Sequence, residues 1–107
     1  MKKKKMNEFD KLVVDQLKDP AFTLAYLNEH LVYTGPQRLE LILDALRKVA
    51  ESRGIGSVVR KSKLSRRTLF HVLSKSGNPT LETFLKLLDA VGVKIVFDVA
   101  PPARKAM

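Results

Sequence analysis

The chain of 107 residues has no cysteine and few aromatic residues, 7% in all. Without cysteine, disulfides and cysteine-based zinc sites are excluded, and a reducing compartment is compatible with the sequence. No apolar run reaches the roughly 18–20 residues that are needed to cross a bilayer. The basic start MKKKKMNEFD lacks the apolar core of a signal peptide. We therefore expect one globular domain that needs no cofactor and no metal and does not enter a membrane.

Negative charge is absent from one long window of the chain. No Asp or Glu lies between Glu51 and Glu82, and RKSKLSRRTLFHVLSKSGNPT fills most of this window. Its seven cations are Arg53, Arg60, Lys61, Lys63, Arg66, Arg67 and Lys75. The other thirteen Lys and Arg nearly balance the eleven acids, so the net charge of +9 comes mainly from this window and the Lys2–Lys5 tail. A local basic excess indicates a polyanionic partner, which could be DNA, RNA or an acidic lipid surface.

Hydrophobic residues recur at helical spacing along most of the chain, which predicts an all-α fold. A short N-terminal helix is expected around Phe9, Leu12, Val13 and Leu17. A second helix follows Asp19 and Pro20 and runs to about Val32, with Leu24, Leu27 and Leu31 facing inward. A third helix follows Pro36 and ends at Gly54, and its inner stripe is Leu39, Ile42, Leu43, Leu46, Val49 and Ala50.

The acid-free window predicts two short helices. Val58, Val59 and Leu64 surround Lys61–Lys63 in the first, and Ser65 caps the second, which runs from Arg66 to about Ser74. Leu69, Val72 and Leu73 form the inner face of the second helix, so Arg66, Arg67, Phe70, His71 and Ser74 should point outward. Thr80 caps a last helix that ends at Gly92 and buries Leu81, Phe84, Leu85, Leu88 and Val91.

The segment Lys94–Val99 is β-branched and partly alternating, which predicts a strand that Pro101 and Pro102 stop. A single strand cannot satisfy its own backbone, and another copy of the chain is the simplest partner. We therefore expect a homodimer in which Ile95, Phe97 and Val99 contribute to the interface.

Two short helices joined by a tight turn, the second with a polar outer face, are typical of a helix-turn-helix. The second helix of such a unit lies in the major groove of duplex DNA, where Arg can bond guanine O6 and N7. The residues predicted to contact DNA are Ser57, Lys61, Lys63, Ser65, Arg66, Arg67, Thr68, Phe70, His71 and Lys75. The alternative is a solvated surface, and Phe70 could instead pack on a neighbouring helix. A stacking surface for single-stranded RNA would be limited to Phe70 and His71.

Four segments together resemble a known family: YLNEHL (26–31), ALRKVAESRGI (45–55), LSRRTLFHVLS (64–74) and GNPTLETFLKLLDAVGVK (77–94). In this order and spacing they are similar to addiction-module antidotes, which are HigA-like antitoxins of the XRE/Cro-type helix-turn-helix class. The resemblance covers roughly residues 9–99. It implies a lambda-repressor-like bundle in a cytoplasmic bacterial protein, without enzymatic activity, that neutralises a RelE/ParE-like toxin. It also implies repression of its own operon through an operator, expected to be an inverted repeat.

The resulting domain prediction has five parts: a basic tail (1–8), an N-terminal helical extension (9–35), a helix-turn-helix domain (36–93), a dimerisation strand (94–100) and a flexible tail (101–107). The chain departs from the family at Val59, where a small residue is usual, and at Lys63, where Gly is usual. A left-handed Lys63 would cost about 1 kcal/mol.

The toxin-binding surface is predicted at Tyr26, His30 and Tyr33, because they are amphipathic rings outside the DNA element. Two other functions remain open: a stand-alone phage-type repressor without a toxin, and a protein-interaction module whose basic face binds DNA only weakly.

Overall fold

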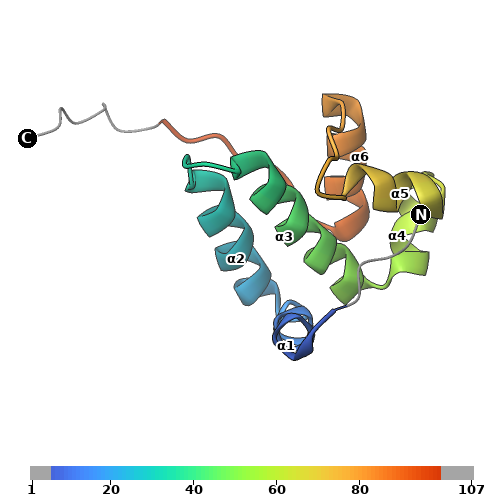
Figure 1. The fold of residues 1–107 in the computed structure, drawn as a ribbon, viewed down its shortest axis with the longest axis horizontal. Coiled ribbons are helices and arrows are strands. Elements are labelled where there is room, and N and C mark those ends of the chain that lie inside the picture. Colours follow the sequence, from blue (N-terminus) through green and yellow to red (C-terminus); the bar gives the residue numbers. More distant parts are fainter. Residues whose placement is uncertain (1–5, 100–107) are drawn as a thin grey trace, which may run out of the picture.

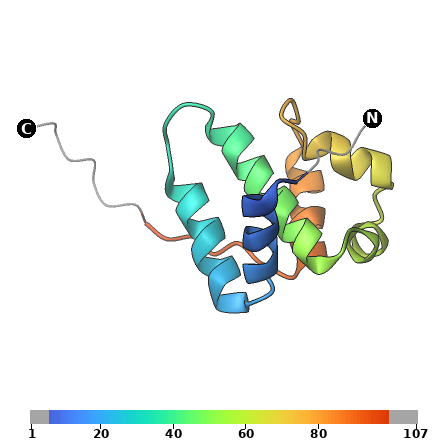
Figure 2. The ribbon, with the colours of Figure 1, turned by 60° about the horizontal axis from the view of Figure 1, so that its bottom comes forward.

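The computed structural model describes residues 6–99, and these residues form six α-helices and no strand. The helices are α1 (Glu8–Gln16), α2 (Pro20–Val32), α3 (Arg38–Arg53), α4 (Ile55–Ser62), α5 (Arg66–Val72) and α6 (Leu81–Val91). Helices α2 and α3 lie side by side, α1 packs against α3, and α4, α5 and α6 gather on the other side of α3 (Figures 1 and 2). The all-α prediction is confirmed. None of the helices in residues 6–99 is long and apolar enough to cross a membrane.

Capping side chains begin three of the helices, as the sequence predicts. The Asp19 carboxylate accepts a hydrogen bond from the Ala21 N–H at 3.1 Å, and the hydroxyls of Ser65 and Thr80 accept from Thr68 and Thr83 at 3.0 and 3.1 Å. These bonds satisfy backbone donors that have no partner within the helix. Gly92 ends α6 with a φ of 83°, a left-handed conformation that costs glycine little.

The core lies where α3 meets the other helices. It contains Val13 and Leu17 of the N-terminal segment, Leu43, Leu46, Val49 and Ala50 of α3, Ile55 and Val58 of α4, Leu69 and Leu73 at α5, and Leu87, Leu88, Ala90 and Val91 of α6. Four residues of the predicted stripe of α3 are therefore buried, whereas Ile42 is half-buried and Leu39 is exposed. Leu39 lies in the first turn of α3.

Several leucines predicted to face inward are exposed instead. Leu24 is 65% exposed and Leu31 is also exposed, whereas the buried residue of α2 is Thr23. Leu81 and Leu85 of α6 are exposed, and Leu87 and Ala90 are buried in their place. Both helices are apolar around much of their circumference, so periodicity alone does not decide which side packs on α3.

The predicted strand is absent from the described chain: residues 94–99 belong to no helix or strand. The physical reason is that a strand requires a paired backbone, and no second extended segment lies in residues 6–99. The N-terminal helix begins at Glu8, capped by Asn7, one residue inside the predicted tail. The Lys2–Lys5 tail and residues 100–107 lie outside the described residues.

Candidate nucleic-acid interface

Helices α4 and α5 are joined by Lys63, Leu64 and Ser65. Lys63 adopts a left-handed conformation with φ 63° and ψ 17°, and its N–H donates to the Val59 carbonyl at 3.0 Å. Val58 and Leu69 are fully buried and anchor one helix each to the core. Lys63 therefore adopts the left-handed turn conformation in which Gly is usual in the family, and the strain expected for a lysine applies at this position.

Five cations of the acid-free window lie exposed on this unit: Arg60, Lys61, Lys63, Arg66 and Arg67. Within the described chain none of the five makes an ion pair. Arg66 and Arg67 occupy the first turn of α5, where the helix dipole is positive and cations are mildly unfavourable. We call these five residues the basic surface. Its charges are open to an anionic partner because no neighbouring carboxylate neutralises them.

The hydroxyl residues of the predicted DNA-binding set are largely committed to the fold. Ser65 accepts from the Thr68 N–H and donates to the Thr68 side-chain oxygen at 2.9 Å. Thr68 remains exposed and keeps its own hydroxyl proton. Ser57 is half-buried in α4 and lines a separate pocket with Arg53, Lys61 and Lys18.

Three predicted DNA contacts remain: His71 and Lys75 are exposed, whereas Phe70 is half-buried. His71 is exposed on α5, as expected. Phe70 is half-buried and packs against the core, which corresponds to the alternative that the sequence left open and not to a fully outward side chain. The seven-residue helix α5 is apolar on more than one side, and the core covers Phe70 in addition to Leu69. Lys75 is exposed but lies 3.9 Å from Glu40 of α3, so the window without acids in sequence meets one in space.

Arg53 belongs to the same acid-free window but has a structural position that the sequence did not reveal. Its guanidinium donates to the Leu17 carbonyl at 2.8 Å and the Val91 carbonyl at 3.0 Å, which lie at the ends of α1 and α6. It also reaches the Thr23 hydroxyl of α2 at 3.3 Å. Its fixed fork of donors satisfies two carbonyls at the ends of α1 and α6 and also contacts a hydroxyl of α2. One signal was available, since Arg53 immediately precedes the helix-ending Gly54.

A second set of charges joins α1 and α3. Lys48 lies 2.8 Å from Asp44 and 3.3 Å from Asp10, and Arg47 donates to Asp44 at 2.8 Å. Arg47 and Asp10 are buried and Lys48 is nearly so. We call Asp10, Asp44, Arg47 and Lys48 the buried charge cluster. Buried charges require such partners, because an unpaired charge in the interior is strongly destabilising.

The pKa values of Asp44 and Lys48 in this cluster, and of Tyr26 beside it, are shifted. Burial would raise the pKa of Asp44, but hydrogen bonds from Lys48 and Arg47 and their charges lower it below its usual value. Burial would lower the pKa of Lys48, but its bonds to Asp44 and the nearby negative charges raise it. Burial raises the pKa of Tyr26, against the opposing effect of Lys48. These shifts keep Asp44 and Lys48 ionised and Tyr26 neutral at physiological pH.

The three rings predicted to bind a toxin do not form one surface. Tyr26 and His30 contact each other, with ring centroids 4.4 Å apart, and a His30 ring nitrogen lies 2.8 Å from the Tyr26 carbonyl oxygen. Both rings are half-buried. Tyr33 lies past the end of α2 and donates its hydroxyl to the Pro36 carbonyl at 2.9 Å. Only Tyr26 and His30 are therefore neighbours, and each also has a role within the fold.

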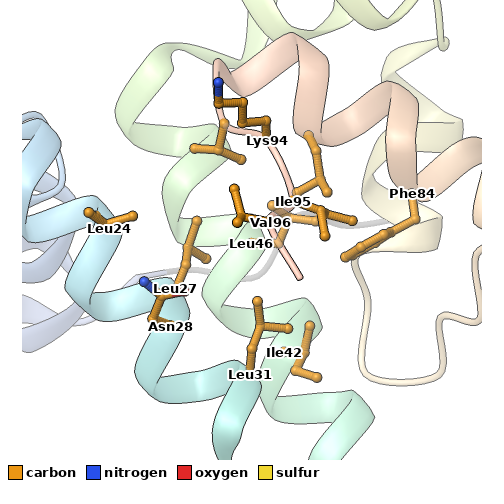
Figure 3. Close-up of a pocket in the computed structure, with 12 residues that line it drawn as sticks. Leu24, Leu27, Asn28, Leu31, Ile42, Leu46, Phe84, Lys94, Ile95 and Val96 are labelled. Carbon is orange, nitrogen blue, oxygen red and sulfur yellow. The ribbon is translucent and has the colours of Figure 1, made fainter. Parts of the chain in front are cut away.

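An apolar groove of about 170 Å³ lies beneath the C-terminal segment (Figure 3). Its walls come from α2, α3, α6 and residues 93–96: Leu24, Leu27, Asn28, Leu31, Ile42, Leu46, Phe84, Leu88, Val93, Lys94, Ile95 and Val96. The exposed leucines of α2 therefore line this groove. In the described chain no group of three or more His, Cys, Asp or Glu residues could hold a metal ion.

The helical bundle exposes a basic surface that suits a binding protein. The model of the family "Probable addiction module antidote protein" matches residues 5–99, and the chain belongs to this family. A relative in Haemophilus influenzae, described only as an uncharacterized protein, is 34% identical over 89 residues, which is 83% of this chain and 87% of the relative. No solved structure matches the chain significantly. An antidote is the protective member of a toxin–antidote pair, so membership of the family supports an antitoxin role and implies a toxin as partner.

Proposed function

We propose that this chain is the DNA-binding antitoxin of a type II toxin–antitoxin module. It forms a homodimer, neutralises a RelE/ParE-like toxin, and represses its own operon by binding an inverted-repeat operator. In this proposal α4 and α5 are the two helices of a helix-turn-helix in a lambda-repressor-like bundle. The observation that carries the DNA-binding part is the basic surface, whose five cations have no carboxylate partner among residues 6–99.

On duplex DNA, α5 lies in the major groove and α4 crosses the phosphate backbone. Arg66 and Arg67 are at the N-terminus of α5, where side chains of a recognition helix reach base edges. Lys61 and Lys63 lie at the end of α4 and in the turn, close to where the phosphates pass. Phosphates would neutralise charges that the fold leaves unpaired, and bidentate bonds from Arg to guanine would supply sequence preference.

The toxin is bound by a different part of the chain, so that one molecule can hold toxin and operator together. Tyr26 and His30 on α2 lie outside the basic surface and form a half-buried pair of rings. Paired aromatic rings supply a large contact area at low entropic cost, which suits an interface. Tyr33 is a separate candidate at the end of α2.

The DNA-binding part is tested by selection from a randomised duplex pool at about 150 mM salt, where weak phosphate binding is suppressed. We expect an inverted repeat whose half-sites are about one helical turn, ~34 Å, apart. The variant Arg66→Ala/Arg67→Ala should lose the selection while retaining its helical circular-dichroism spectrum. Binding without sequence enrichment that disappears as salt rises would instead favour a protein-interaction module.

The antitoxin part is tested by co-expression of the chain with the product of the adjacent gene. Growth should stop with the toxin alone and resume when the chain is added. Tyr26→Ala/His30→Ala should weaken toxin affinity, and His71→Ala on α5 is the control that should not. A neighbouring gene product without toxicity would support the stand-alone repressor.

A further inference from the structure

The C-terminal segment, residues 94–99, carries backbone groups and apolar side chains that the described chain does not cover. Its backbone makes no hydrogen bond to another backbone group of residues 6–99, and the Val99 N–H bonds only to the Asp98 carboxylate. Val96, Phe97 and Val99 are 78%, 93% and 89% exposed. A β-branched segment with a free backbone is an edge to which another strand can be added.

The sequence of this segment is complementary to itself when two copies run antiparallel. With Val96 opposite Val96, Lys94 of each copy lies opposite Asp98 of the other, and these residues share one face with Val96. On the second face Ile95 lies opposite Phe97. One face thus carries two pairs of opposite charges around the central valines, and the other is entirely apolar.

Neighbouring registers lose this complementarity. A two-fold axis at Ile95 or Phe97 places Val96 opposite Lys94 or Asp98. An axis between residues pairs positions of unlike faces, such as Ile95 with Asp98 or Phe97 with Lys94. Because each slip places a charge opposite an apolar side chain, the register centred on Val96 is the favoured one.

We propose that residues 94–98 of two copies form an antiparallel two-stranded ribbon with its two-fold axis at Val96. This inference rests on the homodimer of the proposed function and adds its interface and register. Self-pairing about a two-fold axis is the symmetry that makes one surface complementary to itself. The strand predicted from the sequence does not form in a single chain because it has no partner. In the proposed ribbon, the second copy is that partner.

The apolar groove can pack against the apolar face of this ribbon. Ile95 lines the groove and is 43% exposed, less than the other apolar residues that follow it in the segment. In the proposed register, Phe97 of the second copy lies beside Ile95 on the same side of the ribbon. That ring would enter the groove between the exposed residues Leu24 and Leu31 of α2 (Figure 3). A two-stranded ribbon alone is marginal in water, and this packing on the helices stabilises it.

The register is tested by single cysteines, since the chain has none of its own. In the proposed ribbon the two Val96→Cys positions are directly opposite, about 4.5–5.5 Å apart between Cα atoms, which fits a disulfide. The Phe97→Cys positions are offset by about 6.8 Å along the strands and cannot be bridged without a slip. Under mild oxidation we expect disulfide dimers of Val96→Cys to form at least about tenfold faster than those of Phe97→Cys. Equal rates, or faster bridging of the more exposed Phe97→Cys, would overturn the register.

A charge exchange tests the same contacts without cysteine. Lys94→Asp and Asp98→Lys should each weaken the dimer by about fivefold or more, because like charges then face each other at two places. The double variant Lys94→Asp/Asp98→Lys should recover the affinity of the original chain in analytical ultracentrifugation. Absence of recovery, with an unchanged helical spectrum, would overturn the pairing of Lys94 with Asp98.

These outcomes can be separated from those of the proposed function. A selected inverted repeat together with failed Val96→Cys bridging would retain DNA binding and place the dimer interface elsewhere. Rapid Val96→Cys bridging without any selected sequence would retain the ribbon and remove operator binding.

Discussion

The cations of the buried charge cluster have carboxylate partners within the fold, whereas those of the basic surface have none among the described residues. In the cluster, Lys48 has two carboxylate partners within 3.3 Å, and Arg47 has one at 2.8 Å. On α4, α5 and their turn, five cations have no partner among the described residues, and Lys75 just beyond them has only Glu40 at 3.9 Å. The first arrangement joins helices of the same chain. The second is unfavourable in isolation and becomes favourable beside a polyanion.

Arg53 lies in the same acid-free window as the basic surface, but its donors are satisfied inside the fold, like those of the cluster. Positive charge in a sequence window therefore does not by itself define a binding surface. What distinguishes the two uses is whether the donors are already satisfied inside the fold. The four predictions below separate stability from DNA binding on this basis.

The largest effect is expected from Arg53→Ala. Removal of the guanidinium takes the donor from the Val91 carbonyl and leaves the Leu17 carbonyl with the Thr23 hydroxyl alone, and should lower the free energy of unfolding by about 2–4 kcal/mol. Chemical denaturation measures this change. Arg60→Ala, an exposed residue of the basic surface, is the control and should stay within about 0.5 kcal/mol of the original chain. Equal stability of the two variants would contradict the structural role of Arg53.

Arg66→Ala should have the reverse pattern. Stability should hardly change, while binding to the selected operator should weaken by about 1–3 kcal/mol if Arg66 bonds guanine in the major groove. Titration on operator and scrambled duplexes measures both affinities, with Lys86→Ala on α6 as the control. An equal loss on both duplexes would mean that Arg66 contacts a phosphate and reads no base.

Asp44→Asn tests the buried charge cluster through pH. The lowered pKa of Asp44 means that its contribution is present above the ordinary value of 3.8 and is lost as pH falls through the lowered pKa. At neutral pH we expect the variant to be less stable by about 1–2 kcal/mol, and the difference should vanish in acid.

Urea denaturation between neutral pH and the acid limb follows this difference. Asp15→Asn, which removes an exposed pair with Lys18, is the matched control and should change stability by less than about 1 kcal/mol. The raised pKa of Lys48 acts in the opposite direction, so its contribution is present below the ordinary value of 10.5 and is lost as pH rises through the raised pKa. A pH-independent loss in Asp44→Asn would mean that packing, and not charge, accounts for the effect.

The smallest effect is expected from Lys63→Gly. Glycine adopts a φ of 63° without strain, so the variant should gain about 0.5–1 kcal/mol of stability. If Lys63 contacts a phosphate, the slope of log affinity against log salt should fall by about 1. Lys61→Gly, inside α4, is the contrasting variant and should lose stability. A less stable Lys63→Gly would mean that the lysine side chain itself supports the turn.

Local signals in the sequence predicted much of this molecule. Asp19, Ser65 and Thr80 cap helices as expected, and the core stripe of α3 is largely correct, because caps and periodicity depend on residues close in the chain. The exposure of Arg66, Arg67 and His71 also followed from their places on a short helix. In α6, Leu88 and Val91 are buried as predicted, but Leu81 and Leu85 are exposed, and in α2 the buried side did not follow from the sequence, because its apolar residues lie on more than one side.

Composition and local pattern thus determined an all-helical chain with a concentrated positive charge and an unpaired β-branched end. Only the tertiary structure decided that Arg53 turns inward, that Phe70 packs on the core and that Lys75 meets Glu40. It also decided that Leu24 and Leu31 line a groove beneath the C-terminal segment. These outcomes depend on which distant groups come together, and neither a cap nor a period encodes such contacts, because each is set by residues only a few positions apart.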